Sequence, residues 1–498
     1  MTTPDGTLAA VDIGSNSFRL ELGQMQGSRY RRVDYLKETV RLGAGLDGDG
    51  QLSDEAAERG LACLRRFAAR LDGLPAERVR AVATQTLREA RNRDAFLDQA
   101  QAALGRPIEI ISGREEARLI YAGVSQLQPS GEPRLVVDIG GRSTEMILGR
   151  GRTPVIVESF AVGSVSLSMR YFADGRLTED AFRAAQVAAG AELEEALEPF
   201  AARHWRHALG SSGTAGAVSQ LLAASGVTQG EITPAALRWC ITRCVEAGHI
   251  DKLDLPGLRD DRRPVIAGGL AILYTLGTHF GIKALQPAKG ALRQGVIVDL
   301  HERLAASRKS TPPLDMRDAS VRALQQRFMV DKLQAKRVRT VALALHAGAM
   351  PEAGNETVRE LGWAADLHEL GMMVSHHDHH RHSAYLLAHA DAAGFSQSQQ
   401  RRLAELVLGQ RGGLRKIADS LTSEAFAWQV LALRLAAIVC HARGPLGAHT
   451  LRLARQGSEA RLHYDAAWGE AHPRAVYLLG EEAEAWSGSG VLALRLPA

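Results

Sequence analysis

The sequence is poor in the features that mark secreted and membrane proteins. Of 498 residues only four are cysteine: Cys63, Cys240, Cys244 and Cys440. Cys240 and Cys244 are one helical turn apart, which is not the C-x-x-C spacing of zinc and redox sites. No basic segment followed by a long apolar run opens the chain, and no run of about twenty apolar residues occurs. We therefore expect reduced thiols and a cytoplasmic protein with no integral membrane segment.

An excess of charge of one sign is also lacking. The chain has 60 Lys and Arg against 56 Asp and Glu, a net charge of +4, so nucleic acid is not an expected partner. Hydrophobic residues make up 45% and charged residues 23%, the composition of an ordinary globular protein. Because domains usually hold roughly 100–200 residues, the length predicts several of them.

Strand and helix patterns alternate over the first 130 residues, as in an α/β layer. We expect strands over 7–13, 17–24, 30–37 and 107–113, a strand that leads into a turn within 79–87, and helices over 53–71, 94–104 and 114–124. Ser53 is a suitable N-cap for the first of these helices.

The same pattern starts again at Leu135. We expect strands over 136–139, 144–148 and 153–163, and helices over 179–197, 213–224, 234–247, 261–278 and 290–305. At one offset of 126 residues the two copies share Val11/Val137, Asp12/Asp138, Ile13/Ile139, Gly14/Gly140, Ser17/Ser143, Leu22/Leu148 and Gly23/Gly149. This repeat predicts a duplicated half-domain with two similar turns facing each other across a cleft.

A linker rich in Ser, Pro and Arg over 305–318 separates these halves from a helical region and a final part of mixed strands and helices. We expect domains at 1–130 and 131–306, a helical domain at 314–443 and a small α+β domain at 447–498.

The turns after the repeated strands have the residue types of a metal and phosphate site. In "VDIGSNS" and "VDIGGRST" an Asp ends a strand, and glycines and small polar residues follow. Backbone N–H groups in such turns point at anions, and carboxylates bind Mg²⁺. A single copy could equally be a polar hairpin turn. A third turn, "ALGSSGTAGAV", opens a helix, whose N-terminus favours phosphate.

These motifs resemble the actin-like ATPase superfamily, and within it the exopolyphosphatase/guanosine-pentaphosphate phosphohydrolase (Ppx/GppA) family. The resemblance rests on "AAVDIGSNSFRL", "TQTLREARN", "IEIISGREEARLIYAGV", "VVDIGGRSTEMILG", "SSGT" and "KGALRQGV", and it extends to "WAADLHELG" and "HRHSAYLLAHAD". It implies a duplicated actin-like (ribonuclease H-like) ATPase fold, followed by an all-helical HD-like domain and a small α+β C-terminal domain, as in the long four-domain exopolyphosphatases.

The resemblance also implies hydrolysis of a terminal phosphate without a covalent intermediate. The family's base maps onto Glu116, and a helix-dipole role is the alternative for the Glu115–Glu116 pair. Arg88 is a candidate phosphate clamp. Asp12, Asp138 and Glu145 are expected to hold Mg²⁺, and a monovalent cation such as K⁺ is compatible with the site. The expected substrate-binding residues in the three turns are Gly14, Ser15, Asn16, Ser17, Gly140, Gly141, Arg142, Ser143, Thr144, Ser212, Gly213 and Thr214.

One residue departs from the family pattern. The second turn usually has a third glycine where this chain has Arg142. If the position requires a positive φ, arginine strains the turn. If it does not, Arg142 adds positive charge beside the phosphates.

The helical region contributes two further features. His368, His376, His377, His379, His380 and His382 lie close together in sequence, but His368 is followed by Glu369 where a metal-binding His-Asp pair needs Asp. We expect a degenerate, structural or substrate-guiding domain, with a second metal centre as the alternative. Residues 306–340 hold nine basic residues against three acidic ones, and Arg411, Arg415 and Lys416 form a basic loop. A basic track suits an extended polyanion, and a solvated helix face is the other interpretation.

The expected function is that of an exopolyphosphatase, with Mg²⁺-dependent, processive hydrolysis of the terminal phosphate of inorganic polyphosphate. The alternative is hydrolysis of guanosine pentaphosphate to tetraphosphate on the same residues. These guanosine phosphates are then partners as substrate or inhibitor. An actin-like kinase or chaperone and an inactive polyphosphate sensor are further alternatives. The family implies a homodimer.

Overall fold

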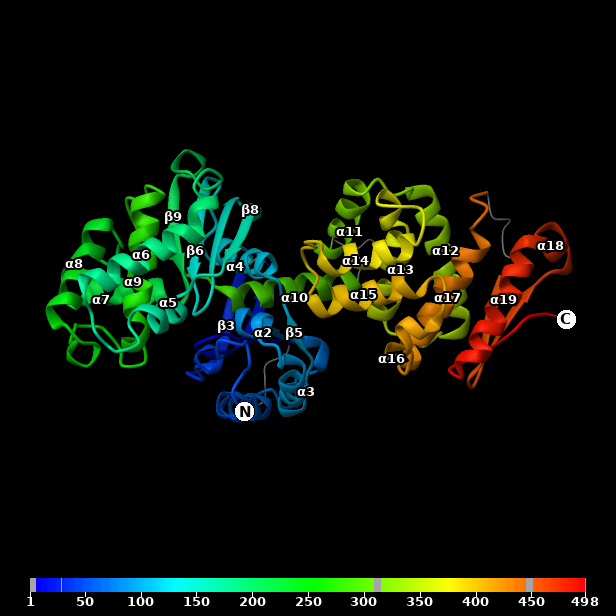
Figure 1. Ribbon diagram of the computed structural model, residues 1–498, viewed down its shortest axis with the longest axis horizontal. Helices are drawn as coiled ribbons and strands as arrows, with labels where there is room; N and C mark the ends of the chain where they lie inside the picture. The colour runs from blue at the N-terminus through cyan, green and yellow to red at the C-terminus, as the bar shows by residue number, and fades with distance from the viewer. Residues whose placement is uncertain (1–5, 28, 309–314, 445–450, 498) are drawn as a thin grey trace. The chain divides into compact units, whose positions relative to one another are not determined.

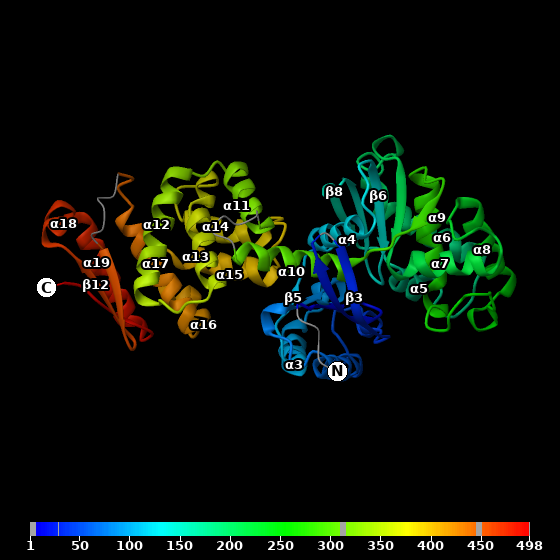
Figure 2. The same cartoon turned by 180° about the vertical axis from the view of Figure 1, so that it is seen from behind.

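The computed structural model describes residues 6–27, 29–308, 315–444 and 451–497 (Figure 1; Figure 2 from behind). The chain divides into two compact units, Met1–Arg308 and Lys309–Ala498. The boundaries expected at 314 and 447 fall outside the described residues, so the division into four domains stays a prediction. In the part of the chain that is described, no helix has the length and apolar character needed to cross a membrane.

Each half of the first unit builds one five-stranded sheet. The strand orders are β3-β2-β1-β4-β5 and β8-β7-β6-β9-β10. The strands of the first sheet are β1 (Leu8–Ile13), β2 (Phe18–Gln26), β3 (Arg29–Glu38), β4 (Val79–Ala83) and β5 (Ile108–Ile110). Those of the second are β6 (Pro133–Ile139), β7 (Thr144–Arg150), β8 (Thr153–Phe160), β9 (His207–Ser211) and β10 (Leu285–Pro287).

The two sheets match strand for strand. β1 pairs antiparallel with β2 and parallel with β4, and β6 pairs in the same way with β7 and β9. The register shifts between Leu22 and Gly23 in one sheet and between Leu148 and Gly149 in the other. These positions are equivalent at the offset of the sequence repeat. The predicted duplication is therefore confirmed.

Seven of the eight helices predicted for the first unit start within two residues of their expected positions. Helices and 3-10 turns flank the sheets. They are η1 (Leu42–Gly45), α1 (Asp54–Arg70), η2 (Ala76–Arg78), α2 (Gln85–Glu89), α3 (Arg93–Leu104), α4 (Gly113–Leu127), α5 (Ser164–Tyr171), α6 (Glu179–Leu193), η3 (Glu194–Ala196), η4 (Ala202–His204), α7 (Ser212–Ala224), α8 (Pro234–Ala247), η5 (Ile250–Lys252), η6 (Arg263–Val265), α9 (Ile266–His279) and α10 (Leu292–Arg308). Ser53 caps α1 as expected, because its side chain accepts a hydrogen bond from the N–H of Ala56.

One predicted helix is wrong at its start. The helix expected from residue 261 begins at Ile266, after the 3-10 turn η6. The carboxylate of Asp261 accepts hydrogen bonds from Lys37 (2.9 Å) and Arg259 (3.0 Å), so this segment is held in a loop. Two helices, α2 and α5, are not among the predicted elements, and β4 ends at Ala83 before α2 begins at Gln85.

Helices α4 and α10 form a central pair between the two sheets (Figure 1). Their side chains share one hydrophobic cluster with both sheets, in which Val82, Ile147 and Ile297 are buried. The two helices approach closely because glycines of each helix lie against the backbone of the other where they cross. A Cβ on Gly295 would lie 1.7 Å from the carbonyl oxygen of Leu119. The crossing therefore excludes any side chain there.

The second unit is a helical body followed by a small sheet, as the sequence predicts. Its helices are α11 (Met316–Arg327), α12 (Lys332–Ala349), α13 (Asn355–Leu367), η7 (Leu370–Met373), α14 (His379–His389), α15 (Gln397–Gly409), η8 (Leu414–Ile417), α16 (Ala418–Leu421) and α17 (Glu424–Val439). The last part consists of β11 (Leu451–Gln456), β12 (Glu459–Tyr464), α18 (Ala466–Ala471), α19 (Pro473–Ser489) and β13 (Ala493–Arg495). Trp428 and Trp486 are fully buried in one core that joins both parts.

Candidate functional site

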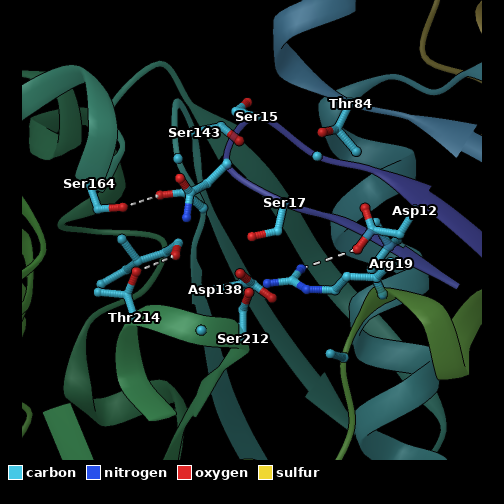
Figure 3. Close-up of a pocket in the computed structure, with 18 of the residues that line it drawn as sticks. Asp12, Ser15, Ser17, Arg19, Thr84, Asp138, Ser143, Ser164, Ser212 and Thr214 are labelled. Carbon is cyan, nitrogen blue, oxygen red and sulfur yellow. Dashed lines mark hydrogen bonds and ion pairs between the residues drawn. The ribbon is translucent and has the colours of Figure 1, made fainter. Parts of the chain in front are cut away.

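The two repeated turns and the third turn line one cavity between the halves of the first unit (Figure 3). Asp12 lies near the end of β1 and Asp138 near the end of β6, the central strands of the two sheets. The predicted residues that line the cavity are Asp12, Gly14, Ser15, Asn16, Ser17, Glu116, Asp138, Gly140, Gly141, Ser143, Ser212, Gly213 and Thr214. The structure thus brings together most of the site that the sequence predicts.

Asp12 and Asp138 are both buried but have different surroundings. Asp12 pairs with Arg19 at 3.2 Å (Figure 3). It also pairs with Arg293 at 3.6 Å. Burial raises the pKa of Asp138 to about 6, and hydrogen bonds from Ser211 and Ser212 oppose that rise. The cavity therefore has one carboxylate already paired with cations and one without an ion pair among the residues that are described.

The adjacent acids at the start of α4 point to different surroundings. Glu116 lines the cavity. Glu115 is held by Arg118 through two hydrogen bonds of 2.7 and 2.8 Å, away from the cavity. Burial raises the pKa of Glu116 to about 7, and the nearby Arg88 opposes the rise. A carboxyl group with a pKa near neutrality can accept a proton efficiently at physiological pH.

Arg88 has other partners than the expected phosphate. Its guanidinium donates to Glu116 (2.9 Å), to the carbonyl of Ile111 (2.9 Å) and to Gln85 (2.6 and 2.9 Å). It is not among the residues that line the cavity. This geometry makes Arg88 a positioning residue for the Glu116 carboxylate.

Two donors in the first turn lack partners. The Asn16 Nδ2 and the Ser17 Oγ are buried, and no described residue forms a hydrogen bond with either. A buried polar group without a partner costs about 1–3 kcal/mol. Ser212 adds strain in the third turn, because it has φ 71°, a left-handed conformation that is costly for a residue with a side chain. Unpaired donors and a strained helix N-terminus fit an anion such as phosphate.

Arg142 bridges the two halves. Its φ is not in the left-handed region, so arginine does not strain the turn. The guanidinium donates to Glu89 (2.7 Å) and to the carbonyl of Gly43 (3.1 Å), both in the first half. The Arg142 side chain does not line the cavity, and its positive charge is paired with the carboxylate of Glu89.

Thr144 and Glu145 also lie outside the cavity lining. The Thr144 hydroxyl donates to the carbonyl of Val162, and Glu145 accepts a hydrogen bond from Ser159 (2.8 Å). Burial raises the pKa of Glu145 well above its usual value. The side chains of both residues therefore have hydrogen-bond partners in the second sheet and its loops.

Two of the three predicted Mg²⁺ ligands, Asp12 and Asp138, line the cavity. Over the described ranges, no three His, Cys, Asp or Glu side chains form a group that could hold a metal ion. The joint ligand set of Asp12, Asp138 and Glu145 stays a prediction. Mg²⁺ commonly takes one or two carboxylates and completes its shell with water and substrate phosphates. Asp12 and Asp138 fit that pattern, since both line the cavity.

Sequence reasoning missed several cavity residues. Thr84, Ser164, Arg19, Arg262 and Arg293 all line the cavity. Strand periodicity could have identified Arg19, because residues two apart on a strand share a face and Ser17 already points into the site. Arg293 lies in the quoted motif "KGALRQGV" but had no predicted role.

A second, strongly basic cavity of about 270 Å³ shares part of this lining. Its basic residues are Arg19, Arg32, Lys37, Arg259, Arg262, Lys289 and Arg293, and no acidic residue lines it in the described chain. The Glu21 carboxylate accepts a hydrogen bond of 3.2 Å from the Nε of Arg293. Six of the seven cations also pair with Asp12, Glu21 or Asp261, which do not line this cavity. Seven cations against three carboxylates leave an excess of positive charge, which favours a ligand with several phosphates.

Several of the predicted basic residues of the second unit form ion pairs or hydrogen bonds within that unit. Arg317 pairs with Asp315 and Arg339 with Asp366. Lys416 donates to the carbonyl of Arg411, and burial lowers the pKa of Lys416 to about 8. Lys309 and the side chain of Arg308 lie outside the described residues.

Comparison with known proteins gives a consistent result. Residues 24–304 match the model of the Ppx/GppA phosphatase family, and residues 316–483 match Ppx/GppA phosphatase, domain III. A guanosine-5'-triphosphate,3'-diphosphate pyrophosphatase of Pseudoalteromonas atlantica is 35% identical over 94% of this chain and 93% of its own length.

Solved structures resemble the first unit. An exopolyphosphatase of Cytophaga hutchinsonii has a TM-score of 0.54 at 22% identity, over 59% of this chain and 97% of its own. An exopolyphosphatase-like protein has a TM-score of 0.53 at 25% identity, over 60% of this chain and 98% of its own. The predicted duplicated actin-like fold is therefore confirmed.

Proposed function

The chain belongs to the Ppx/GppA phosphatase family, and on that premise we propose that it removes the terminal phosphate of inorganic polyphosphate. The observation that carries the proposal is one continuous set of residues. Glu116 and the unpaired donors of the first turn line a cavity that shares Arg19, Arg262 and Arg293 with the basic cavity beside it. A terminal phosphate fits the first cavity and the remaining phosphates fit the second.

The chemistry follows from the placement of these groups. A water oxygen attacks the terminal phosphorus, and its proton passes to the Glu116 carboxylate. The bond between that phosphorus and the bridging oxygen breaks, so orthophosphate and a shortened polyphosphate leave. Turn N–H groups and Arg19 stabilise the charge that develops on the phosphoryl oxygens. Mg²⁺ held by Asp12 and Asp138 would neutralise further charge.

Guanosine pentaphosphate is the second candidate substrate. It is favoured by the 35% identity to a protein named for that activity over nearly the whole chain. Both substrates end in phosphoanhydride-linked phosphates, so both would use the same base and turns.

The deciding experiment compares phosphate release from long-chain polyphosphate, guanosine pentaphosphate and ATP by the purified chain with Mg²⁺. We expect the highest kcat/KM on polyphosphate and the lowest on ATP. A higher kcat/KM on guanosine pentaphosphate would select the second candidate. Activity on ATP alone would overturn both.

The pH profile tests the assignment of the base. Because Glu116 must be ionised to accept a proton and its pKa is about 7, kcat/KM should fall as pH decreases below about 7. Arg88 lowers that pKa, so Arg88→Gln should raise it and move the acid limb to higher pH by about one unit. The variant should then regain activity at pH 9. A uniform loss at every pH would contradict a positioning role.

Chain-length dependence tests the basic loop of the second unit. Arg411 and Arg415 are exposed. Changing Arg411, Arg415 and Lys416 together to alanine should raise KM for long-chain polyphosphate more than for tripolyphosphate. The difference should shrink in high salt, because screening weakens interactions between exposed charges. An equal rise in KM for both chain lengths would show that this loop does not bind long-chain polyphosphate.

A further inference from the structure

The second unit contains a cavity of its own, of about 670 Å³. This volume lies in the range of sites for small organic ligands. Its apolar lining comes from Met372, Ala437, Ile438, Leu478 and Ala485. Helices α17 and α19 and the segment η7 supply these residues, so the walls belong to well-packed elements. Of the residues assigned to the proposed function, only Arg411 lines it.

Two buried imidazoles face this cavity. His379 is 6% exposed, and its Nδ1 has no hydrogen-bond partner in the described chain. His368 is 3% exposed, and its Nδ1 donates to the carbonyl of Ala365 at 2.7 Å. The Nε2 of His368 is therefore left as an acceptor. Unpaired buried polar atoms are costly, so this part of the lining suits a ligand that supplies both donors and acceptors.

The geometry does not make this set a metal centre. Glu369, the acid beside His368, accepts a hydrogen bond from Arg443. Within the described residues, these imidazoles and Glu369 do not come together as a group that could hold an ion. The alternative of a second metal centre has no support in this arrangement, and an organic ligand fits the volume better.

The charges single out one end of the cavity. Arg434 pairs with Glu482, and Arg443 pairs with Glu369, so these four lining charges cancel in ion pairs. Arg411 has no ion-pair or hydrogen-bond partner for its guanidinium among the residues described. Gly412 follows at φ 75°, and no described residue accepts from the N–H of Gly412 or Gly413. Successive free N–H groups beside an unpaired arginine are typical of a phosphate site.

We propose that this cavity binds a nucleoside phosphate. The phosphate binds Arg411 and the N–H groups of Gly412 and Gly413. The base lies on the apolar wall, with its ring donors and acceptors facing His368 and His379. Glu481, which also lines the cavity from α19, accepts hydrogen bonds from amino or hydroxyl groups of the ligand. This site is distinct from the cavity assigned to phosphate hydrolysis.

The first test is a calorimetric titration of the full-length chain with GDP and with ADP. Arg411→Ala should weaken the binding of at least one of them by about tenfold or more, the effect of losing a hydrogen bond to a charged group. Arg415→Ala is the matched control, because Arg415 is exposed in the same loop and does not line the cavity. Its Kd should equal that of the wild type. Equal affinity in the wild type and Arg411→Ala would overturn the proposal.

A second variant separates the cavity from the loop. Ala485 is exposed at the edge of the lining, so Ala485→Trp should fold and should obstruct the site. We expect it to abolish the Arg411-dependent binding, whereas Glu484→Trp, at an exposed position outside the lining, should retain it. Unchanged binding in Ala485→Trp would overturn the cavity assignment. Inorganic pyrophosphate is the third ligand to be titrated. If it binds as tightly as GDP and its binding also depends on Arg411, the proposal that the cavity binds a nucleoside is overturned.

Discussion

Glu116→Gln should lower kcat by about 10²–10⁴, the usual contribution of a positioned general base. The amide keeps the size and hydrogen-bonding capacity of the side chain, but it cannot take the proton of the attacking water. Binding of phosphate and of unreacted polyphosphate should remain, because the turn donors and the arginines of the basic cavity are unchanged. Single-turnover phosphate release and equilibrium binding measure the two effects separately.

Glu115→Gln is the control for that change. Glu115 is buried beside Glu116, but both its oxygens accept from Arg118, which also pairs with Asp299. Breaking a buried ion pair costs about 3–5 kcal/mol. We therefore expect Glu115→Gln to lower the stability of the first unit while the folded fraction keeps its kcat. Near wild-type turnover in Glu116→Gln, or a catalytic loss in Glu115→Gln without loss of stability, would contradict the assignment of the base.

Gly295→Ala should destabilise the first unit by about 3 kcal/mol or more, at the upper end of overpacking effects. The new Cβ would lie 1.7 Å from the Leu119 carbonyl oxygen, and backbone cannot move aside as a side chain can. The helices α4 and α10 would have to separate. Because α4 carries Glu116 and the first turn of α10 carries Arg293, kcat/KM should fall as well.

Gly216→Ala is the matched control for the effect of Gly295→Ala on stability; activity is not compared, because Gly216 lines the basic cavity. Gly216 lies within α7, and a Cβ there would meet no atom within 4 Å. Replacing a free helical glycine by alanine should stabilise by roughly 0.5–1 kcal/mol. Urea unfolding followed by circular dichroism compares the two variants. Equal stability of Gly295→Ala and the wild type would show that the crossing can adapt.

The repeat in the sequence is a good guide to the fold, because it records backbone geometry. Asp12 and Asp138 end equivalent strands, and even the register shift at Gly23 recurs at Gly149. Side-chain partners are predicted less well, because a motif does not say which distant residue an arginine contacts. Arg88 and Arg142 were both expected on phosphate. The structure pairs Arg88 with Glu116 and Arg142 with Glu89, residues 28 and 53 positions away.

The basic cavity could not be predicted from the sequence for a related reason. Its cations come from β2, β3, the loop before α9 and the start of α10. Arg19 and Arg293 are far apart in the sequence and meet only because α10 returns to the first sheet. Local patterns identify the three turns, whereas the basic cavity depends on that long-range packing.

The return of α10 has a consequence for synthesis on the ribosome. The apolar residues Leu8, Ala10 and Val82 of the first sheet are covered in part by Val296 and Ile297 of α10. At about 5–20 residues per second, the roughly 180 residues between β5 and this helix take on the order of 10–40 s to make. During that interval the nascent first half has an uncovered apolar face. We therefore expect chaperones to bind this face of the nascent chain until α10 has been synthesised.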